Sequence, residues 1–154
     1  MPPVPSSTPA YHERLWVPLR WWVQGTMLVA SLWLAMVVAV PGPLAWVLTA
    51  AALGLMALLF LSYGSAAVTL SDGVLHAGRA QIEVRHLGEA TALDEDAARR
   101  AAGVEADARA FLLLRPYRKR ALMVEIADPA DPAPYWLISS RRPQAIVEAL
   151  RANT

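Results

Sequence analysis

Cysteine is absent from the 154 residues, and this absence removes several kinds of site at once. Without a thiol the chain has no disulfide framework, no thiolate metal ligand and no cysteine nucleophile. Charged residues are scarce as well, at 18% of the chain, whereas an ordinary soluble domain carries about a quarter. The composition is therefore that of a chain with a large uncharged part.

Sequence motifs of the common enzyme classes are also missing. The chain contains no GxSxG, no GxxxxGK and no GxGxxG, so nothing predicts a nucleophile elbow, a phosphate-binding loop or a dinucleotide site. The three histidines, His12, His76 and His86, lie far apart and match no metal-binding spacing. We therefore expect no cofactor and no metal ion, and a non-catalytic protein is favoured.

An excess of charge of one sign is lacking too. After Ser71 the chain has twelve Lys or Arg and twelve Asp or Glu. A nucleic-acid-binding domain needs a basic face that neutralises phosphates. The balance predicts that nucleic acid is not a partner.

The longest uncharged stretch contains two apolar runs, at residues 21–40 and 44–63. About twenty residues of helix cross the hydrocarbon core of a bilayer. Pro41-Gly42-Pro43 separates the runs and cannot continue a helix. We predict a transmembrane hairpin over residues 21–63. The alternative is a cleaved signal peptide that ends within VAVPGPLA.

Basic residues near the two runs predict the orientation of the hairpin. Arg14 and Arg20 precede the first run, Arg79 and Arg85 follow the second, and the connection has none. The positive-inside rule then places both termini in the cytoplasm, in a multi-pass protein of the cytoplasmic (inner) membrane. Residues 1–10, rich in Pro and Ser, are expected to be a disordered leader. Residues 11–20 are amphipathic and are expected to lie along the membrane interface.

Small residues recur at helical spacing in both runs and allow two backbones to approach closely. They are Ser31, Ala35 and Ala39 in the first run and Ala50 and Gly54 in the second. Two interpretations stay open, which are packing within the hairpin and an interface with a second copy or a protein partner.

Residues 66–154 alternate with a period of two and predict a cytoplasmic β-rich domain. Asp72-Gly73 between two short apolar runs predicts a tight hairpin. The acidic start of residues 94–103 indicates a short helix or a long surface loop, and Pro143 starts a last helix that reaches Leu150. The fold class is a membrane α-helical hairpin followed by a small mostly-β (α+β) domain of about six or seven strands with a C-terminal helix.

One loop and strand gather acidic, aromatic and basic side chains that form a candidate partner or ligand site. They are Asp128, Asp131, Tyr135, Trp136, Arg141 and Arg142. Two carboxylates three residues apart can hold a cation or act as acid and base. In the alternative interpretation the aspartates cap turns of a proline-rich loop and pair with Arg141 or Arg142.

A basic run, Arg118, Lys119 and Arg120, is expected at the turn between two strands. A domain tethered beside an anionic leaflet can use such a run to contact lipid headgroups, which makes membrane lipid a candidate partner. The alternative is a solvated hairpin tip whose charges keep the sheet edge soluble.

Three long segments are similar to one uncharacterised family of short actinobacterial membrane proteins, domain of unknown function family 3093. They are YHERLWVP at residues 11–18, GVEADARAFLLLRPY at 103–117 and DPADPAPYWLISSRRP at 128–143, which fits the pattern DPxDPxPYWLxSxRRP. The resemblance implies a two-span membrane protein and brings no activity, substrate or catalytic residue. The order of the expected elements is also similar to pleckstrin-homology-like domains, a likeness of architecture alone.

These observations favour a membrane-anchored, non-catalytic module that binds a protein or lipid partner at the inner face of the membrane. The alternative is a small membrane enzyme that acts on a lipid or envelope precursor through residues 128–142. Transport ranks last, because two spans without an ionisable residue offer no pathway for a polar solute.

Overall fold

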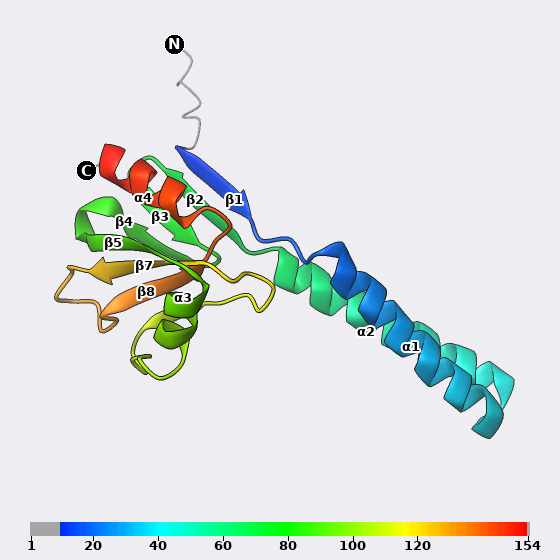
Figure 1. The fold of residues 1–154 in the computed structure, drawn as a ribbon. Coiled ribbons are helices and arrows are strands. Elements are labelled where there is room, and N and C mark those ends of the chain that lie inside the picture. The colour runs from blue at the N-terminus through cyan, green and yellow to red at the C-terminus, as the bar shows by residue number, and fades with distance from the viewer. Residues whose placement is uncertain (1–9, 154) are drawn as a thin grey trace, which may run out of the picture. The chain divides into compact units, whose positions relative to one another are not determined.

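The computed structural model describes residues 10–153, which divide into two compact units (Figure 1). A helical unit runs from Trp16 to Ser65, and a soluble unit combines the described residues on either side of it. Each unit is described by itself below. The expected leader, apart from Ala10, lies outside the described residues.

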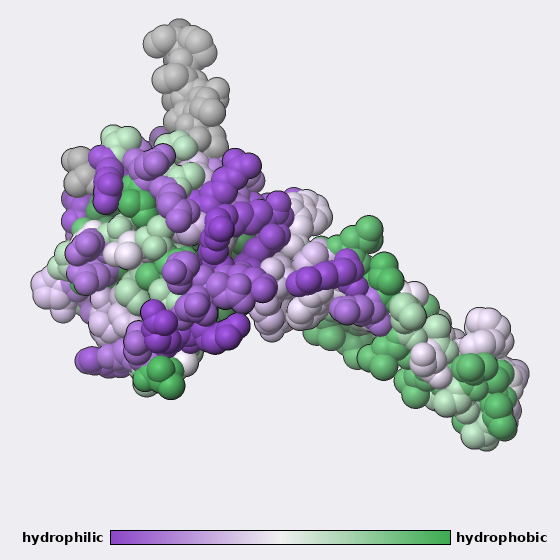
Figure 2. Space-filling view, viewed as in Figure 1, coloured by the Kyte–Doolittle hydropathy of each residue, from purple (hydrophilic) through white to green (hydrophobic). Residues whose placement is uncertain are grey.

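The helical unit is a pair of long apolar helices, α1 (Leu19–Ala39) and α2 (Gly42–Gly64). Both are long and apolar enough to cross a membrane. In the most apolar 18-residue stretch of each helix, 0% of α1 and 6% of α2 is buried. A core helix of a soluble protein would be mostly buried, so these helices are candidate membrane spans. Apolar side chains cover much of their surface, whereas polar ones dominate the visible face of the soluble unit (Figure 2). The predicted helical hairpin is confirmed.

Close packing between the two helices centres on a glycine that the small-residue pattern did not include. A Cβ added at Gly25 would lie 2.5 Å from Met56 Sδ and 3.5 Å from the Phe60 ring, whereas one added at Gly54 would meet nothing within 4 Å. The predicted interface residues Ser31, Ala35, Ala39 and Gly54 are exposed. They therefore do not supply the contact within the hairpin, and their role in an interface with a partner stays a prediction.

One sheet of the soluble unit is antiparallel throughout, in the order β1-β2-β3-β4. Its strands are β1 (Tyr11–Arg14), β2 (Ala67–Ser71), β3 (Val74–Ala77) and β4 (Ala80–Glu83). Asp72 and Gly73 join β2 to β3 with φ angles of 52° and 71°. Glycine and aspartate tolerate this left-handed conformation, as a two-residue hairpin turn requires. The predicted turn is confirmed.

The prediction for residues 11–20 is wrong at its first four positions, because Tyr11–Arg14 form a strand of the soluble unit. Glu13 and Leu15 are buried while His12 and Arg14 are exposed, which is the two-residue period of a half-buried strand. Strand β1 pairs with β2, and the Leu15 N–H donates to the Ala66 carbonyl at 3.0 Å. The amphipathic pattern belongs to a sheet edge.

The second sheet has the order β5-β7-β8-β6. Its strands are β5 (Leu87–Leu93), β6 (Phe111–Leu113), β7 (Ala121–Ile126) and β8 (Tyr135–Ser139), and a 3₁₀ turn at Val84–His86 precedes β5. Strands β6 and β7 do not pair with each other, since each lies beside β8, and β6 runs parallel to it. The prediction that Arg118, Lys119 and Arg120 form the turn of a strand pair is therefore wrong, because they belong to a crossover past the end of β8.

Two apolar layers explain why β8 is buried along nearly its whole length. Trp136 and Ile138 join the main core, which takes side chains from both sheets and from helix α4 (Pro143–Ala152). Leu137 points the other way, into a smaller core with Ala98 and Ala101 of helix α3 (Glu95–Ala102). A strand buried on both faces reads as a continuous apolar run. Two sheets of four strands with a C-terminal helix confirm the α+β class and add one strand to the expected range.

The contrast between the two glycines gives a test of the hairpin. We expect Gly25→Leu to lower its stability by about 2 kcal/mol, because the new side chain overpacks the contact with Met56. Gly54→Leu is the matched control and should leave stability unchanged in the monomer. The thermal midpoint of the full chain in mild detergent, followed by circular dichroism, measures both. Equal effects of the two substitutions would contradict the packing described here.

Candidate functional site

A buried carboxylate joins the two ends of the soluble unit. The Glu13 side chain is only 8% exposed. Its Oε2 accepts hydrogen bonds from the Tyr11 hydroxyl at 2.7 Å and from Ser140 Oγ at 2.6 Å, and its Oε1 accepts from the Arg141 N–H at 2.7 Å. A buried carboxylate is stable only when such donors replace water. Glu13 therefore ties β1 to the connection between β8 and α4.

Two guanidinium groups lie near this carboxylate and a third interacts with Tyr11. We call Tyr11, Glu13, Arg118, Ser140, Arg141 and Arg142 the Glu13 cluster. Arg141 Nε lies 4.0 Å from Glu13 Oε1. Arg118 interacts electrostatically with both Arg141 and Glu13, and Arg142 with Tyr11. The cluster thus contains three cationic side chains and one buried carboxylate.

The electrostatics follow from burial beside like and unlike charges. Burial, followed by the hydrogen bond to Glu13, raises the pKa of Tyr11 to about 12, so its hydroxyl remains a donor at neutral pH. Burial lowers the pKa of Arg118, and the positive charge of Arg141 lowers it further. Arginine nevertheless stays charged in proteins. The cluster therefore holds cations close together and is suited to an anionic partner.

The crossover between β6 and β7 brings Arg118 into the cluster. The Arg115 N–H donates to Ser139 Oγ at 2.9 Å, and the Ser140 N–H donates to the Arg120 carbonyl at 3.1 Å. The Tyr117 hydroxyl donates to the Leu15 carbonyl at 2.8 Å. These bonds fasten the crossover to the ends of both β8 and β1.

The six residues predicted as one site divide among several places. Asp128 Oδ1 accepts from the Ala130 N–H at 2.8 Å, and Asp131 Oδ1 accepts from the Ala133 N–H at 2.9 Å. Both aspartates thus form local turns, as the turn-capping interpretation expects. Their expected ion pairs with Arg141 and Arg142 do not form, because Arg141 lies against Glu13.

The two aromatic residues have structural roles. The Tyr135 hydroxyl accepts from the Asp107 N–H at 2.9 Å. Trp136 is buried, with its ring centroid 4.8 Å from that of Phe111 on the neighbouring strand. Neither side chain joins Arg141 or Arg142 in a common site.

Asp128 and Asp131 do line an open hollow of about 400 Å³, together with His76 and His86. The His86 ring lies 4.0 Å from the Asp128 carboxylate. Within residues 10–153, no group of three His, Asp or Glu side chains is arranged to hold a metal ion.

The three residues of the basic run also separate. Arg118 belongs to the Glu13 cluster, while Lys119 Nζ forms an ion pair with Glu95 at 3.1 Å. Arg120 is exposed and contributes its carbonyl to Ser140. Sequence reasoning missed Glu13, although a signal was present, since it is the only acidic residue before the two apolar runs.

Removing the buried carboxylate should loosen β1. We expect Glu13→Ala to cost about 3 kcal/mol, because three donors lose their acceptor in a buried place. Amide hydrogen exchange of the full chain in micelles should then speed up about 100-fold in β1 and at Arg141. Glu148→Ala, an exposed change on α4, is the control and should stay within about 0.5 kcal/mol. Unchanged exchange in the Glu13 variant would contradict a structural role of this carboxylate.

Comparison with known proteins tests the family resemblance suggested by the sequence. No match to the chain is found among curated proteins or among solved structures. The actinobacterial source and the pleckstrin-homology likeness therefore stay predictions. A family model matches residues 10–150, a range that includes both segments joined at Glu13. The chain therefore belongs to the family described as protein of unknown function, DUF3093.

Proposed function

We propose that this protein is a membrane-anchored, non-catalytic module whose Glu13 cluster binds anionic lipid headgroups at the inner face of the membrane. The observation that carries the proposal is that Arg141 and Arg142, both exposed, directly follow the buried contact between Glu13 and Ser140. The positive charges of Arg141 and Arg142 are accessible to a partner. Phosphate oxygens are the natural ligands of guanidinium groups, which can donate two parallel hydrogen bonds.

Chain connectivity supports a lipid as the partner. The crossover that carries Arg118 is fastened to Leu15 by the Tyr117 hydroxyl. Helix α1 starts at Leu19, and four residues of chain reach at most about 14 Å. Leu15 is thereby tethered near the bilayer surface if α1 is a span, and each basic group near an anionic leaflet contributes about 1 kcal/mol.

The enzyme alternative has less support from the geometry. It needs Asp128, Asp131 and Arg141 to converge on one pocket. The two aspartates are engaged in local turns, and Arg141 lies against Glu13. These three residues therefore do not form the single pocket that a reaction on a lipid or envelope precursor would need.

The proposed location is testable because the chain has no cysteine. Gln144 is exposed on α4, and Gln144→Cys gives a single reporter thiol. We expect a membrane-impermeant maleimide to label it in inverted membrane vesicles and in permeabilised cells but not in intact cells. Labelling in intact cells would contradict the inner-face topology, and loss of the protein from carbonate-washed vesicles would contradict the anchor.

Lipid binding is measured on the full chain in mild detergent by native mass spectrometry, with phosphatidylglycerol and phosphatidylcholine titrated separately. We expect preferential retention of phosphatidylglycerol. Arg141→Gln with Arg142→Gln should weaken its binding about 10- to 30-fold, since two charges are worth about 2 kcal/mol together.

The matched control is Arg99→Gln with Arg100→Gln, two exposed charges on α3. These changes should leave phosphatidylglycerol binding as in the wild type. Equal retention of both lipids, or an equal loss in both double variants, would refute the Glu13 cluster as a headgroup site.

A further inference from the structure

The second sheet ends in a strand with one unused edge. Strand β5 pairs with β7 and with no other strand of residues 10–153. Its pairing with β7 is shifted by a bulge between Leu87 and Ala90 and is regular from Ala90 to Leu93. An edge strand presents unpaired N–H and C=O groups that another strand can complete.

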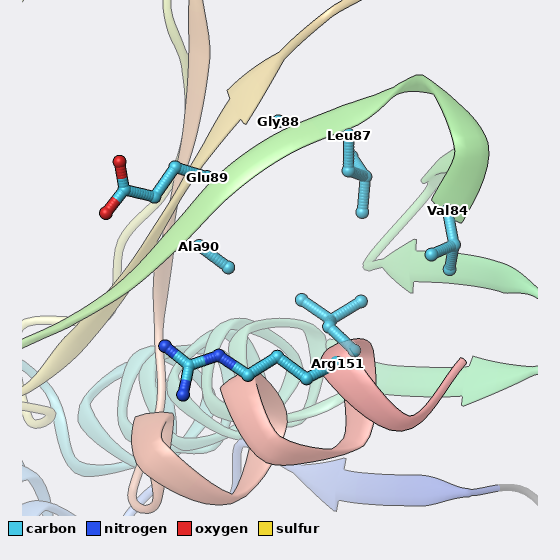
Figure 3. A pocket seen from close by; sticks show the side chains of 7 residues that line it. Val84, Leu87, Gly88, Glu89, Ala90 and Arg151 are labelled. Carbon is cyan, nitrogen blue, oxygen red and sulfur yellow. The ribbon is translucent and has the colours of Figure 1, made fainter. Parts of the chain in front are cut away.

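A cavity of about 200 Å³ lies between β5 and the last turns of α4 (Figure 3). Its lining includes the apolar side chains of Val84, Leu87, Ala90 and Leu150. Leu87 and Ala90 point from the strand toward the helix (Figure 3). The cavity can take one aliphatic side chain of a segment that lies along β5.

Two charged residues, Glu89 and Arg151, border this cavity. The Glu89 carboxylate points to the side of β5 away from α4 (Figure 3), so the positive charge of Arg151 is the one on the helix side. The Arg151 side chain extends along α4 so that its guanidinium lies on the side of Ala90 (Figure 3). Arg151 is exposed and takes part in none of the ion pairs within residues 10–153. A guanidinium beside an apolar floor is complementary to a carboxylate that follows an apolar group.

We propose that β5 and α4 form a binding site for an extended peptide segment of a partner protein. The segment adds as a strand to the edge of β5, places an aliphatic side chain in the cavity and sets an Asp or Glu side chain against Arg151. Main-chain hydrogen bonds supply affinity in this mode of recognition, and alternate side chains supply specificity. A lipid tail could not satisfy the backbone groups of the edge.

This site is separate from the proposed headgroup site. Helix α4 has ten residues, which corresponds to about 15 Å. Arg142 precedes its first turn and Arg151 lies in its last turn. The peptide site therefore lies at the opposite end of α4 from the Glu13 cluster, so one module can contact lipid and protein at the same time.

The test uses the full chain in nanodiscs and a displayed library of random dodecapeptides. We expect enriched sequences to share an aliphatic residue and an Asp or Glu two positions away, the spacing of one strand face. One enriched peptide, made synthetically with a fluorophore, is then titrated by anisotropy. Arg151→Glu should weaken its binding about 10-fold, and a peptide with Lys in place of its acidic residue should bind this variant better than it binds the wild type.

Three controls decide the outcome. Arg79→Glu, an exposed charge reversal between β3 and β4, should leave peptide binding unchanged. A peptide methylated at alternate backbone nitrogens should lose binding, because it cannot complete the edge. Arg141→Gln with Arg142→Gln should keep peptide binding, which separates this proposal from the headgroup site. Absence of enrichment over empty nanodiscs, or binding that ignores both Arg151→Glu and backbone methylation, would overturn the proposal.

Discussion

The soluble unit depends on how one buried carboxylate is satisfied. An ionised side chain removed from water is costly unless donors surround it, and Glu13 obtains them from β1 itself and from the segment after β8. This requirement links the first strand of the unit to its last helix. It also draws arginines to the same place, because Arg141 supplies both a backbone donor and a nearby positive charge. The contact that holds β1 in place is thus also the contact that brings the Arg141 charge to this site.

Most of the fold could be predicted from local patterns. Length and lack of charge predicted the helical hairpin, and Asp72-Gly73 predicted a turn that needs positive φ angles. The pairing of strands distant in sequence could not be predicted. The parallel pairing of β6 with β8 depends on where a crossover passes, and no local residue encodes this. The amphipathic pattern of residues 11–14 fits a membrane interface and a sheet edge equally well, so it does not by itself predict strand β1.

The candidate site was predicted only in part, for a similar reason. Arg118, Arg141 and Arg142 were all singled out from the sequence, but in two separate groups. Glu13, which interacts with Arg118 and Arg141, lies 127 positions before Ser140. No periodic pattern in the sequence indicates a hydrogen bond between residues so far apart. Asp128 and Asp131, by contrast, each accept a backbone hydrogen bond from two residues further along the chain. Such local turns agree with the turn-capping alternative, although the arginine pairs expected with it do not form.

The pairing of β1 with β2 constrains the path of the chain between them. Arg14 and Ala67 are register partners, so the helical pair is an insertion into the connection between two neighbouring strands. In the proposed membrane-anchored form, a chain that leaves this sheet for the bilayer returns to the side from which it departed. That proposal requires an even number of crossings, which a pair of candidate spans provides. Proteolytic release at the first helix would remove β1 together with Glu13, which makes a cleavable export signal incompatible with an intact sheet.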